Sequence, residues 1–293
     1  MTSNLEPRTS NLMKSGTLYI VATPIGNLED MTFRAVRLLK EAGLIAAEDT
    51  RHSRKLLSHF GISRPLTSYF DHNKNFKGAY ILDKLREGVT VALISDAGTP
   101  CISDPGYQLV RDAVAAGIPV VPIPGPSAVI AALSASGLPT DRFAFEGFLP
   151  NRQGKRRDKL LSVRAEERVL VFYESPKRLS AALADLQDVM GDREVVIARE
   201  LTKLHEEFVR GRVSEVMELL RERPPKGEVA ILVAPAPASA ASSMPAVVDL
   251  LRDSLASGTI SLKDAVRKIA METGRPRSEV YAEALRFKES LPR

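Results

Sequence analysis

Short apolar runs that alternate with helix-like stretches constrain this fold more than any other feature. In the first half of the chain each run is followed by a turn and then by a stretch with helical spacing. Residues 32–42 show that spacing clearly, with Val36, Leu38 and Leu39 on one stripe beside Phe33, and Gly43 ending it. The runs lie at 16–22, 44–47, 91–94 and 118–123, and the stretches at 32–42, 51–60, 79–87 and 107–116. This alternation is typical of a parallel sheet covered by helices, so we predict an α/β domain.

The loop that follows the run Val91–Ile94 carries the most chemical information. It contains two Ser-Asp pairs, Ser95-Asp96 and Ser103-Asp104, among glycines and prolines. In open α/β sheets ligands lie beyond the carboxyl ends of parallel strands, which is where this loop is expected. Its two carboxylates disfavour a phosphate ligand, whereas carboxylates and turn carbonyls suit ammonium or sulfonium charge. Two Asx turns without any ligand would explain the same residues equally well.

The second half has the same kinds of segment with more hairpin-like spacing, which predicts a mixed sheet. Expected strands lie at 143–148, 168–173, 194–198, 206–211 and 228–233, and expected helices at 128–136, 176–190 and 214–223. The helix at 176–190 has a clear start, with Ser175 as N-cap and Pro176 in its first turn. Residues 149–157 are predicted to be a loop that carries four cations.

An Ala/Pro/Ser-rich stretch separates the last part of the chain from the rest. Its composition predicts a linker, and the helical stretches beyond it, with Ser278 as the cap of the last one, resemble a helix-turn-helix. We therefore predict a disordered lead-in at 1–15, α/β domains at 16–125 and 126–233, a linker at 234–245 and a helical module at 246–293.

Composition excludes several classes of protein. The chain has 293 residues, of which 44% are hydrophobic and 26% charged, as in ordinary soluble proteins. No apolar run approaches the roughly 20 residues that span a bilayer, and the polar first 15 residues do not resemble a signal peptide. The single cysteine, Cys101, fits a reducing compartment, and the four scattered histidines lack metal-ligand spacing. We expect a cytoplasmic protein without a membrane segment or a metal.

Taken together, the loops resemble those of a known superfamily. The matching segments are Ala22-Thr-Pro-Ile-Gly-Asn-Leu28, Ala47-Glu-Asp-Thr-Arg51, Ser95-Asp-Ala-Gly-Thr-Pro100, Ser103-Asp-Pro-Gly106, Ile123-Pro-Gly-Pro-Ser127, Gly147-Phe-Leu-Pro150 and Phe172-Tyr-Glu-Ser175. They resemble the tetrapyrrole methylases, and more closely the branch of that superfamily that acts on small-subunit ribosomal RNA. The glycine-rich first loop of the tetrapyrrole enzymes is replaced here by Thr23-Pro-Ile-Gly-Asn27, which favours the RNA branch.

The resemblance implies a fold, a cofactor and a reaction. It implies two α/β domains with S-adenosylmethionine bound in a cleft between them, and methyl transfer to the ribose 2′-hydroxyl of a cytidine in 16S ribosomal RNA. The substrate would be free RNA or the assembled small subunit, and the protein a homodimer. Carried over by position, the cofactor-binding residues are Pro24, Ser95, Asp96, Ala97, Gly98, Thr99, Pro100, Ile102, Ser127, Tyr173 and Ala230. We expect Gly98 to let the backbone approach the ligand closely.

Catalysis and RNA binding have separate candidates. A base would help to remove the hydroxyl proton, and the candidates at strand exits are Glu48, Asp49, His72 and Lys203, between which the sequence does not choose. Clustered cations match an RNA backbone, and the candidates are Arg51, Arg152, Lys155, Arg156, Arg157, Lys177, Arg178, Arg275 and Arg277. Because the chain has no tryptophan and few tyrosines, we expect phosphate contacts to matter more than base stacking.

Two other functions remain open at this point. A tetrapyrrole methylase would use the same cofactor on a macrocycle, and a tight chromophoric complex would favour it. A non-catalytic RNA-binding protein on the same fold would bind no S-adenosylmethionine, which calorimetry with that cofactor would detect.

Overall fold

The computed structural model describes residues 15–104, 106–223, 226–237, 250–252, 254, 261–273 and 276–290. The chain divides into two compact units, Met1–Ala128 and Val129–Arg293, and each is described by itself. Among the helices within the described residues, none is both long and apolar enough to cross a membrane.

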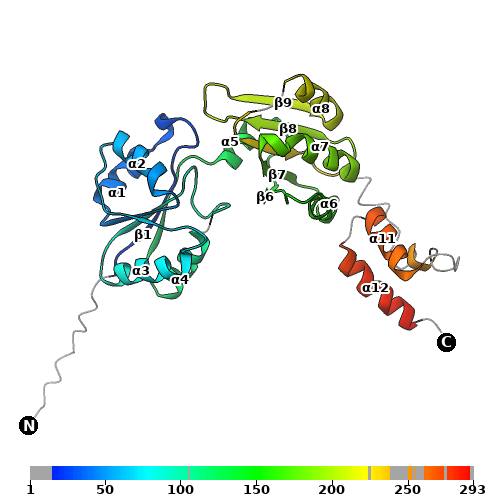
Figure 1. Ribbon diagram of the computed structural model, residues 1–293, viewed down its shortest axis with the longest axis horizontal. Helices are drawn as coiled ribbons and strands as arrows, with labels where there is room; N and C mark the ends of the chain where they lie inside the picture. The colour runs from blue at the N-terminus through cyan, green and yellow to red at the C-terminus, as the bar shows by residue number, and fades with distance from the viewer. Residues whose placement is uncertain are drawn as a thin grey trace, which may run out of the picture. The chain divides into compact units, whose positions relative to one another are not determined.

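The first unit is built on a parallel sheet with strand order β3-β2-β4-β1-β5 (Figure 1). The strands are β1 (Leu18–Val21), β2 (Leu44–Ala47), β3 (Leu66–Ser68), β4 (Val91–Ile94) and β5 (Val120–Ile123). Strands β2 and β4 are buried at every residue, as expected for strands covered on both faces. The predicted parallel α/β sheet is confirmed. Its central strand is β4, so the loop after β4 leaves from the middle of the sheet.

Helices cover both faces of this sheet. They are α1 (Phe33–Glu41), α2 (Thr50–His59), α3 (Lys74–Arg86) and α4 (Gly106–Ala115). Leu39 of α1 and Leu57 of α2 pack on one face, and Ile81 of α3 and Leu109 of α4 pack on the other. Figure 1 shows the two helix pairs on opposite sides of β1. Because the five strands are parallel, their carboxyl ends lie together at one edge of the sheet.

The second unit has a mixed sheet with strand order β6-β7-β10-β8-β9. The strands are β6 (Phe143–Phe148), β7 (Val169–Glu174), β8 (Glu194–Arg199), β9 (Glu207–Arg212) and β10 (Val229–Val233). Only β6 and β7 are parallel, and the other pairs are antiparallel. The predicted mixed sheet is confirmed.

The helices of this unit follow from clear local signals. They are α5 (Ala128–Ser134), α6 (Gln153–Ser162), α7 (Pro176–Met190) and α8 (Val213–Glu222), followed by α11 (Leu262–Thr273) and α12 (Arg277–Ser290). Helix α7 starts with Pro176 and ends before Gly191, whose φ is 81°, as predicted. Ser175 occupies the N-cap position, but its side chain makes no capping hydrogen bond. Its Leu179, Leu183 and Leu186 pack on the sheet. Helices α11 and α12 share a small core that includes Ile269 and Val280.

Several local predictions are wrong. Phe33 begins α1 but is 97% exposed, and Ala35 takes its place on the buried stripe. Residues 153–157 are not loop but the first turns of α6. Ser278 is not an N-cap, because α12 already begins at Arg277. Most of the predicted linker and Arg275 lie outside the described residues.

Candidate functional site

The loop that follows β4, residues 95–104, ties together the loops at the carboxyl edge of the first sheet. Thr23 and Gly98 exchange backbone hydrogen bonds of 2.9 and 3.0 Å, which joins it to the loop after β1. Asp96 Oδ1 accepts a hydrogen bond of 3.0 Å from the Asp49 N–H after β2. Thr99 Oγ1 donates at 3.1 Å to the Pro126 carbonyl after β5. The loops that follow β1, β2, β4 and β5 are thus fixed together as one surface, which we call the β4-loop surface.

The backbone of this loop has a constrained shape. Cys101 and Ser103 both have left-handed φ angles, 74° and 66°, a conformation that costs non-glycine residues of order 1–3 kcal/mol. Asp104 offsets that cost, since its Oδ1 accepts from the Cys101 N–H at 2.7 Å and from the Gly106 N–H at 2.8 Å. Strain held in place by specific hydrogen bonds is typical of ligand-binding loops.

Gly98 is needed first by the protein itself. Its φ is 80°, and a Cβ would lie 3.3 Å from Ile25 Cγ2 and 3.7 Å from the Pro126 carbonyl oxygen. The expectation that this glycine gives room to a ligand is therefore incomplete, because its neighbours are protein atoms of the adjoining loops.

Gly98→Ala is expected to destabilise the first unit by about 1–2 kcal/mol, the cost of a left-handed side-chain residue, and to weaken ligand binding by shifting the β4-loop surface. Gly117→Ala is the matched control, since Gly117 at the end of α4 has a φ of 68° and an added Cβ would meet no atom within 4 Å. Thermal unfolding should report a loss for both variants, and calorimetry with S-adenosylmethionine should report weaker binding only for Gly98→Ala. Equal affinities in the two variants would contradict this role.

The predicted cofactor residues divide between the two units. In the first unit Ala97 and Ile102 are exposed, Ile102 by 46%, while Ser95 and Pro100 are buried within the loop. Pro24 and Ser127 are half-buried on the neighbouring loops. Tyr173 and Ala230 lie opposite each other on β7 and β10 in the second unit. Ala230 is buried and pairs with strands on both sides, so it presents little more than a methyl group.

Carboxylates give the β4-loop surface a negative character. Burial, together with the charges of Asp96 and Asp104, raises the pKa of Glu48. Burial also raises the pKa of Asp104, although the N–H groups of Gly106 and Cys101 partly oppose this. Glu48 and Asp104 line a small pocket together with Tyr69, Leu93, Ile94, Ser95, Pro100 and Gly106. A carboxylate whose pKa is raised by burial and by like charges suits proton transfer.

The other three candidate bases are engaged differently. Asp49 is the N-cap of α2, and its hydrogen bond from the Arg51 N–H at 2.7 Å lowers its pKa. His72 is exposed beside Phe70. Burial alone would lower the pKa of Lys203, but Glu200 at 2.8 Å and Glu228 at 3.3 Å raise it overall. Lys203 is therefore protonated at neutral pH and cannot accept a proton. Glu48 is the best placed candidate, because it is the one of the four that lines the pocket beside the β4 loop.

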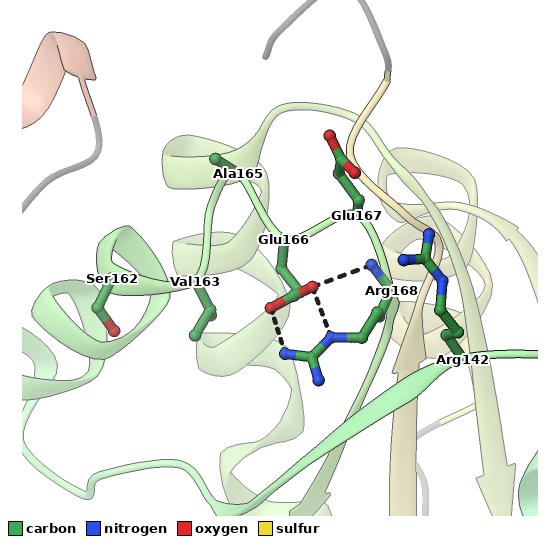
Figure 2. A pocket seen from close by; sticks show the side chains of 7 residues that line it. All are labelled: Arg142, Ser162, Val163, Ala165, Glu166, Glu167 and Arg168. Carbon is green, nitrogen blue, oxygen red and sulfur yellow. Dashed lines mark hydrogen bonds and ion pairs between the residues drawn. The ribbon is translucent and has the colours of Figure 1, made fainter.

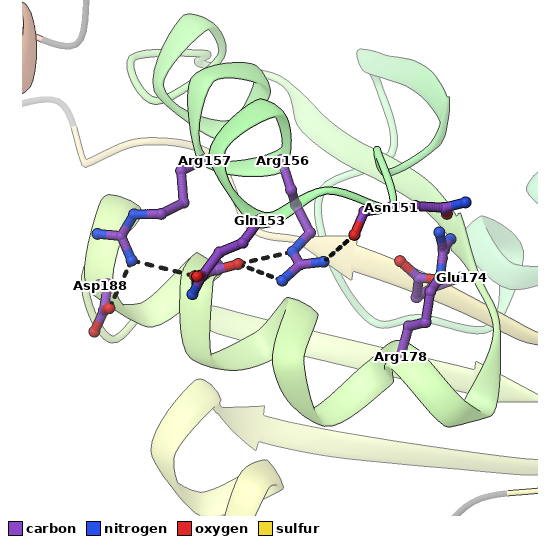
Figure 3. A network of polar contacts seen from close by, with 8 residues as sticks. Asn151, Gln153, Arg156, Arg157, Glu174, Arg178 and Asp188 are labelled. Atoms are coloured by element: carbon purple, nitrogen blue, oxygen red, sulfur yellow. Dashed lines mark hydrogen bonds and ion pairs between the residues drawn. The ribbon is translucent and has the colours of Figure 1, made fainter.

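Part of the predicted cationic set is engaged within the second unit (Figure 3). Arg156 is buried, and its Nε and Nη2 lie 2.7 and 2.6 Å from Asp185 Oδ2. Arg157 pairs with Asp185 at 3.2 Å and with Asp188 at 2.8 Å. Their carboxylate partners lie on α7, so these arginines fasten α6 to α7. The charge of Arg156 is therefore engaged inside the second unit, which disfavours the predicted contact of this arginine with RNA.

The remaining cations differ in how far they reach solvent. Arg178 is paired with the buried Glu174, whose Oε1 accepts from Arg178 Nε at 2.6 Å. Arg51 is 87% exposed and lies 3.6 Å from Asp49. Arg152, Lys155, Lys177 and Arg277 are exposed. Of the six cations predicted near α6 and α7, three therefore stay available to a phosphate backbone: Arg152, Lys155 and Lys177.

A hollow at the opposite end of the second sheet contains none of the predicted site residues. It is lined by Arg142, Ser162, Val163, Ala165, Glu166, Glu167 and Arg168, which precede or lead into β6 and β7 (Figure 2). Glu166 accepts from Arg168 Nε and Nη2 at 2.8 Å each. These hydrogen bonds lower the pKa of Glu166 to about 2. The hollow therefore lies at the amino ends of β6 and β7, with the Glu166–Arg168 pair in its lining.

Sequence reasoning missed an aromatic cluster at the carboxyl ends of β6 and β7. Tyr173 packs against Phe145, with ring centroids 4.9 Å apart, and against Phe148, with centroids 5.5 Å apart. Phe148 is nevertheless 59% exposed. The composition could not predict this cluster, because the cluster depends on an irregularity in the pairing of β6 with β7. The segment Gly147-Phe148 was the only local signal.

Solved structures show which fold this chain has. Cobalt precorrin-4 methyltransferase, an enzyme of cobalamin biosynthesis, matches with a TM-score of 0.56 at 19% identity over 79% of this chain and 98% of that one. Uroporphyrin-III C-methyl transferase from Thermus thermophilus, complexed with S-adenyl homocysteine, matches with a TM-score of 0.51 at 23% identity over 74% of this chain and 97% of that one. At these identities the likeness shows the fold, which is that of the tetrapyrrole methylases.

Sequence comparison narrows this class. The model of the tetrapyrrole (corrin/porphyrin) methylases matches residues 17–217. Ribosomal RNA small subunit methyltransferase I of Halalkalibacterium halodurans is 49% identical over 273 residues, which cover 91% of this chain and 93% of the relative. The chain belongs to the tetrapyrrole methylase family, within the branch formed by ribosomal RNA small subunit methyltransferase I. The resemblance noted from the loops is thereby confirmed.

Proposed function

We propose that this chain transfers a methyl group from S-adenosylmethionine to the ribose 2′-hydroxyl of a cytidine in small-subunit ribosomal RNA. The observation that carries the proposal is the 49% identity, over 91% of the chain, to a ribosomal RNA small subunit methyltransferase I. The first loop supports it over a tetrapyrrole substrate, because Thr23-Pro-Ile-Gly-Asn27 stands where the tetrapyrrole enzymes carry a glycine-rich loop.

The residues present fit the cofactor. S-adenosylmethionine carries a positive sulfonium, and the β4-loop surface holds the carboxylates of Glu48, Asp96 and Asp104. Burial first, and then the charges of Asp96 and Asp104, raise the pKa of Glu48, so these carboxylates favour a cation beside them. Exposed Ala97 and Ile102 offer apolar contact for the rest of the molecule. The residues that would hold it are those predicted around Ser95–Pro100, with Pro24, Ile102, Ser127 and Tyr173. When bound, the cofactor supplies an electrophilic methyl group.

Glu48 is the residue that we propose as the general base. A ribose hydroxyl is a weak nucleophile, and removal of its proton as the new C–O bond forms typically contributes about 100- to 10,000-fold. Glu48 follows β2 directly and adjoins the β4 loop, where Asp96 holds the neighbouring Asp49 N–H at 3.0 Å. Alignment of hydroxyl and methyl group supplies the remaining part of the rate.

Methyl transfer from labelled S-adenosylmethionine tests the function. Purified 16S RNA and assembled small subunits are offered separately, and the label is located by nuclease digestion and nucleoside analysis. Label in 2′-O-methylcytidine from either substrate supports the proposal. Binding of RNA without cofactor binding would indicate the non-catalytic alternative, and transfer to a macrocycle alone would indicate a tetrapyrrole methylase. We also propose a cytoplasmic homodimer, which sedimentation and cell fractionation test.

Replacing Arg152, Lys155 and Lys177 by alanine is expected to weaken RNA binding and to lower its salt dependence. Removing one cation that neutralises a phosphate should reduce the slope of log K against log salt by about 0.7–0.9, so the triple variant should lose about two to three units. Affinity measured from low to high salt gives the slope. Arg51 is an exposed cation of the first unit. Arg51→Ala is measured as a separate single-site variant beside the triple variant. A slope equal to that of the wild type would show that the three cations are ordinary surface charges.

A further inference from the structure

Strand β6 ends with the exposed Phe148, whose ring lies where a regular strand would not place it. Residues three apart on a regular strand face opposite sides of the sheet. The register of β6 against β7 shifts between Phe145 and Phe148, and Gly147 within the shift has a φ of 67°. This bulge brings both phenylalanines to the ring of Tyr173. Bulges are common where a sheet redirects a side chain toward a ligand.

The three rings form a supported platform. The rings of Tyr173 and Phe145 meet at 66° with centroids 4.9 Å apart, and those of Tyr173 and Phe148 meet at 60° with centroids 5.5 Å apart. Tyr173 and Phe145 are half-buried, whereas Phe148 is 59% exposed. Phe148 is thus held from beneath while much of its surface faces solvent, which costs an apolar side chain favourable burial.

Exposed cations follow the two strands that carry this platform. Because β6 and β7 are parallel, the segments that leave them lie at the same edge of the sheet. The first segment leads to exposed Arg152 and Lys155 at the start of α6, and the second to exposed Lys177 at the start of α7. An aromatic surface beside several cations matches a single-stranded nucleic acid, in which bases stack and phosphates pair with positive charge.

We propose that Phe148 is a stacking platform for an unpaired base of the RNA substrate, with Arg152, Lys155 and Lys177 taking adjacent phosphates. This rests on the proposed function, since it assigns a subsite of the same RNA. A single platform serves one base, so the scarcity of tryptophan and tyrosine in the sequence does not oppose it. The base at that position is unstacked from its neighbours and lies beside Tyr173, a residue that we propose to contact the cofactor.

A tryptophan probe tests the stack directly. The chain contains no tryptophan, so Phe148→Trp makes the only indole in the protein. We expect a short single-stranded RNA with the target cytidine to quench its fluorescence, and the same RNA with an abasic site at the stacked position to quench it much less. Phe33→Trp on α1, where the side chain is 97% exposed, is the control and should not respond. If S-adenosylhomocysteine quenches the fluorescence as fully as the RNA does, and RNA added to the saturated complex causes no further quenching, the platform belongs to the cofactor and the proposal is overturned.

Affinity measurements complete the test. Phe148→Ala should raise the Kd for RNA by about 5- to 150-fold, the range for removal of one base stack, and Phe148→Tyr should restore it. The affinity for S-adenosylmethionine and the sedimentation behaviour should stay those of the wild type. An unchanged Kd for RNA, or a change of oligomeric state in Phe148→Ala, overturns the proposal. Wild-type methyl transfer is measured alongside: its absence rejects the proposed function, whereas transfer with an unaffected Phe148→Ala variant rejects only the platform.

Discussion

Replacing Glu48 by glutamine is expected to slow single-turnover methyl transfer by about 100- to 10,000-fold, the usual contribution of a general base. Glutamine keeps the size of the side chain and removes the group that accepts the proton. The affinity for RNA should stay close to that of the wild type, because Glu48 is half-buried at the end of β2. Single-turnover kinetics with enzyme in excess measure the step without product release.

The pH profile gives this prediction its sharpest form. Burial and the charges of Asp96 and Asp104 raise the pKa of Glu48 above 4.5. The base works only when ionised, so the rate should be low at acidic pH, rise as Glu48 ionises at a pH above 4.5, and level off beyond it. In Glu48→Gln this acidic limb should vanish along with most of the rate.

The same raised pKa has the opposite sign for stability. The folded state binds the proton of Glu48 more tightly than the unfolded state does, so ionised Glu48 destabilises the fold at neutral pH. This destabilisation decreases as the pH falls through the pKa of Glu48 in the folded state, and it is absent below the pKa in the unfolded state. Glu48→Gln should therefore unfold at the same or a higher temperature at pH 7. A slow variant that is at least as stable as the wild type cannot be explained by unfolding.

Asp49→Asn is the matched control for Glu48→Gln. The two residues are adjacent, but Asp49 caps α2 through the Arg51 N–H, and asparagine caps helices about as well. The control should keep the acidic limb of the rate profile and most of the rate. If Glu48→Gln kept both while Asp49→Asn or His72→Ala lost them, the base would be one of those residues. If all three variants kept them, alignment alone would account for the rate.

Local patterns predicted the sheets because they act at short range. The predicted run Val91–Ile94 has the same first and last residues as strand β4. Pro176 and Gly191 mark the ends of the observed helix α7. The loop motifs also identified the family. Such signals depend on residues a few positions apart, so the sequence displays them fully.

Features that depend on distant partners could not be predicted in this way. Arg156 resembles any surface cation until Asp185, which is 29 residues away, turns it inward. The exposed Phe148 depends on a register shift between two strands. The choice of Glu48 among four candidate bases depends on Asp96 and Asp104 coming next to it across the sheet. In each case the deciding interaction is tertiary.

Arg156→Ala is expected to destabilise the second unit by about 3–5 kcal/mol, the usual cost of breaking a buried ion pair from one side. The side chains of Arg156 and Asp185 are only 6% and 3% exposed. The variant leaves a buried carboxylate whose remaining donors are Arg157 and Gln153, each at 3.2 Å. Denaturant unfolding measures the loss.

The pH dependence of that stability follows from Asp185. Burial alone would raise its pKa, but hydrogen bonds from Arg156, Gln153 and Arg157 bring it below 3.8. The stabilisation by the ionised carboxylate is therefore complete at neutral pH and is lost only as the pH falls below 3.8 toward the folded value. In Arg156→Ala most of this acid-sensitive stabilisation should be absent already at pH 7.

Arg152→Ala separates this structural role from RNA binding. Arg152 precedes α6 by one residue and is exposed, so its removal should change stability by no more than about 0.5 kcal/mol while lowering the salt slope of RNA binding by somewhat less than one unit. Arg156→Ala should lower the stability and leave the salt slope unchanged at temperatures where it stays folded.

Replacing both partners by apolar residues, Arg156→Met with Asp185→Leu, should recover much of the lost stability, because no buried charge is then left unpaired. A stable Arg156→Ala variant with a reduced salt slope would instead show that this arginine turns outward to meet RNA.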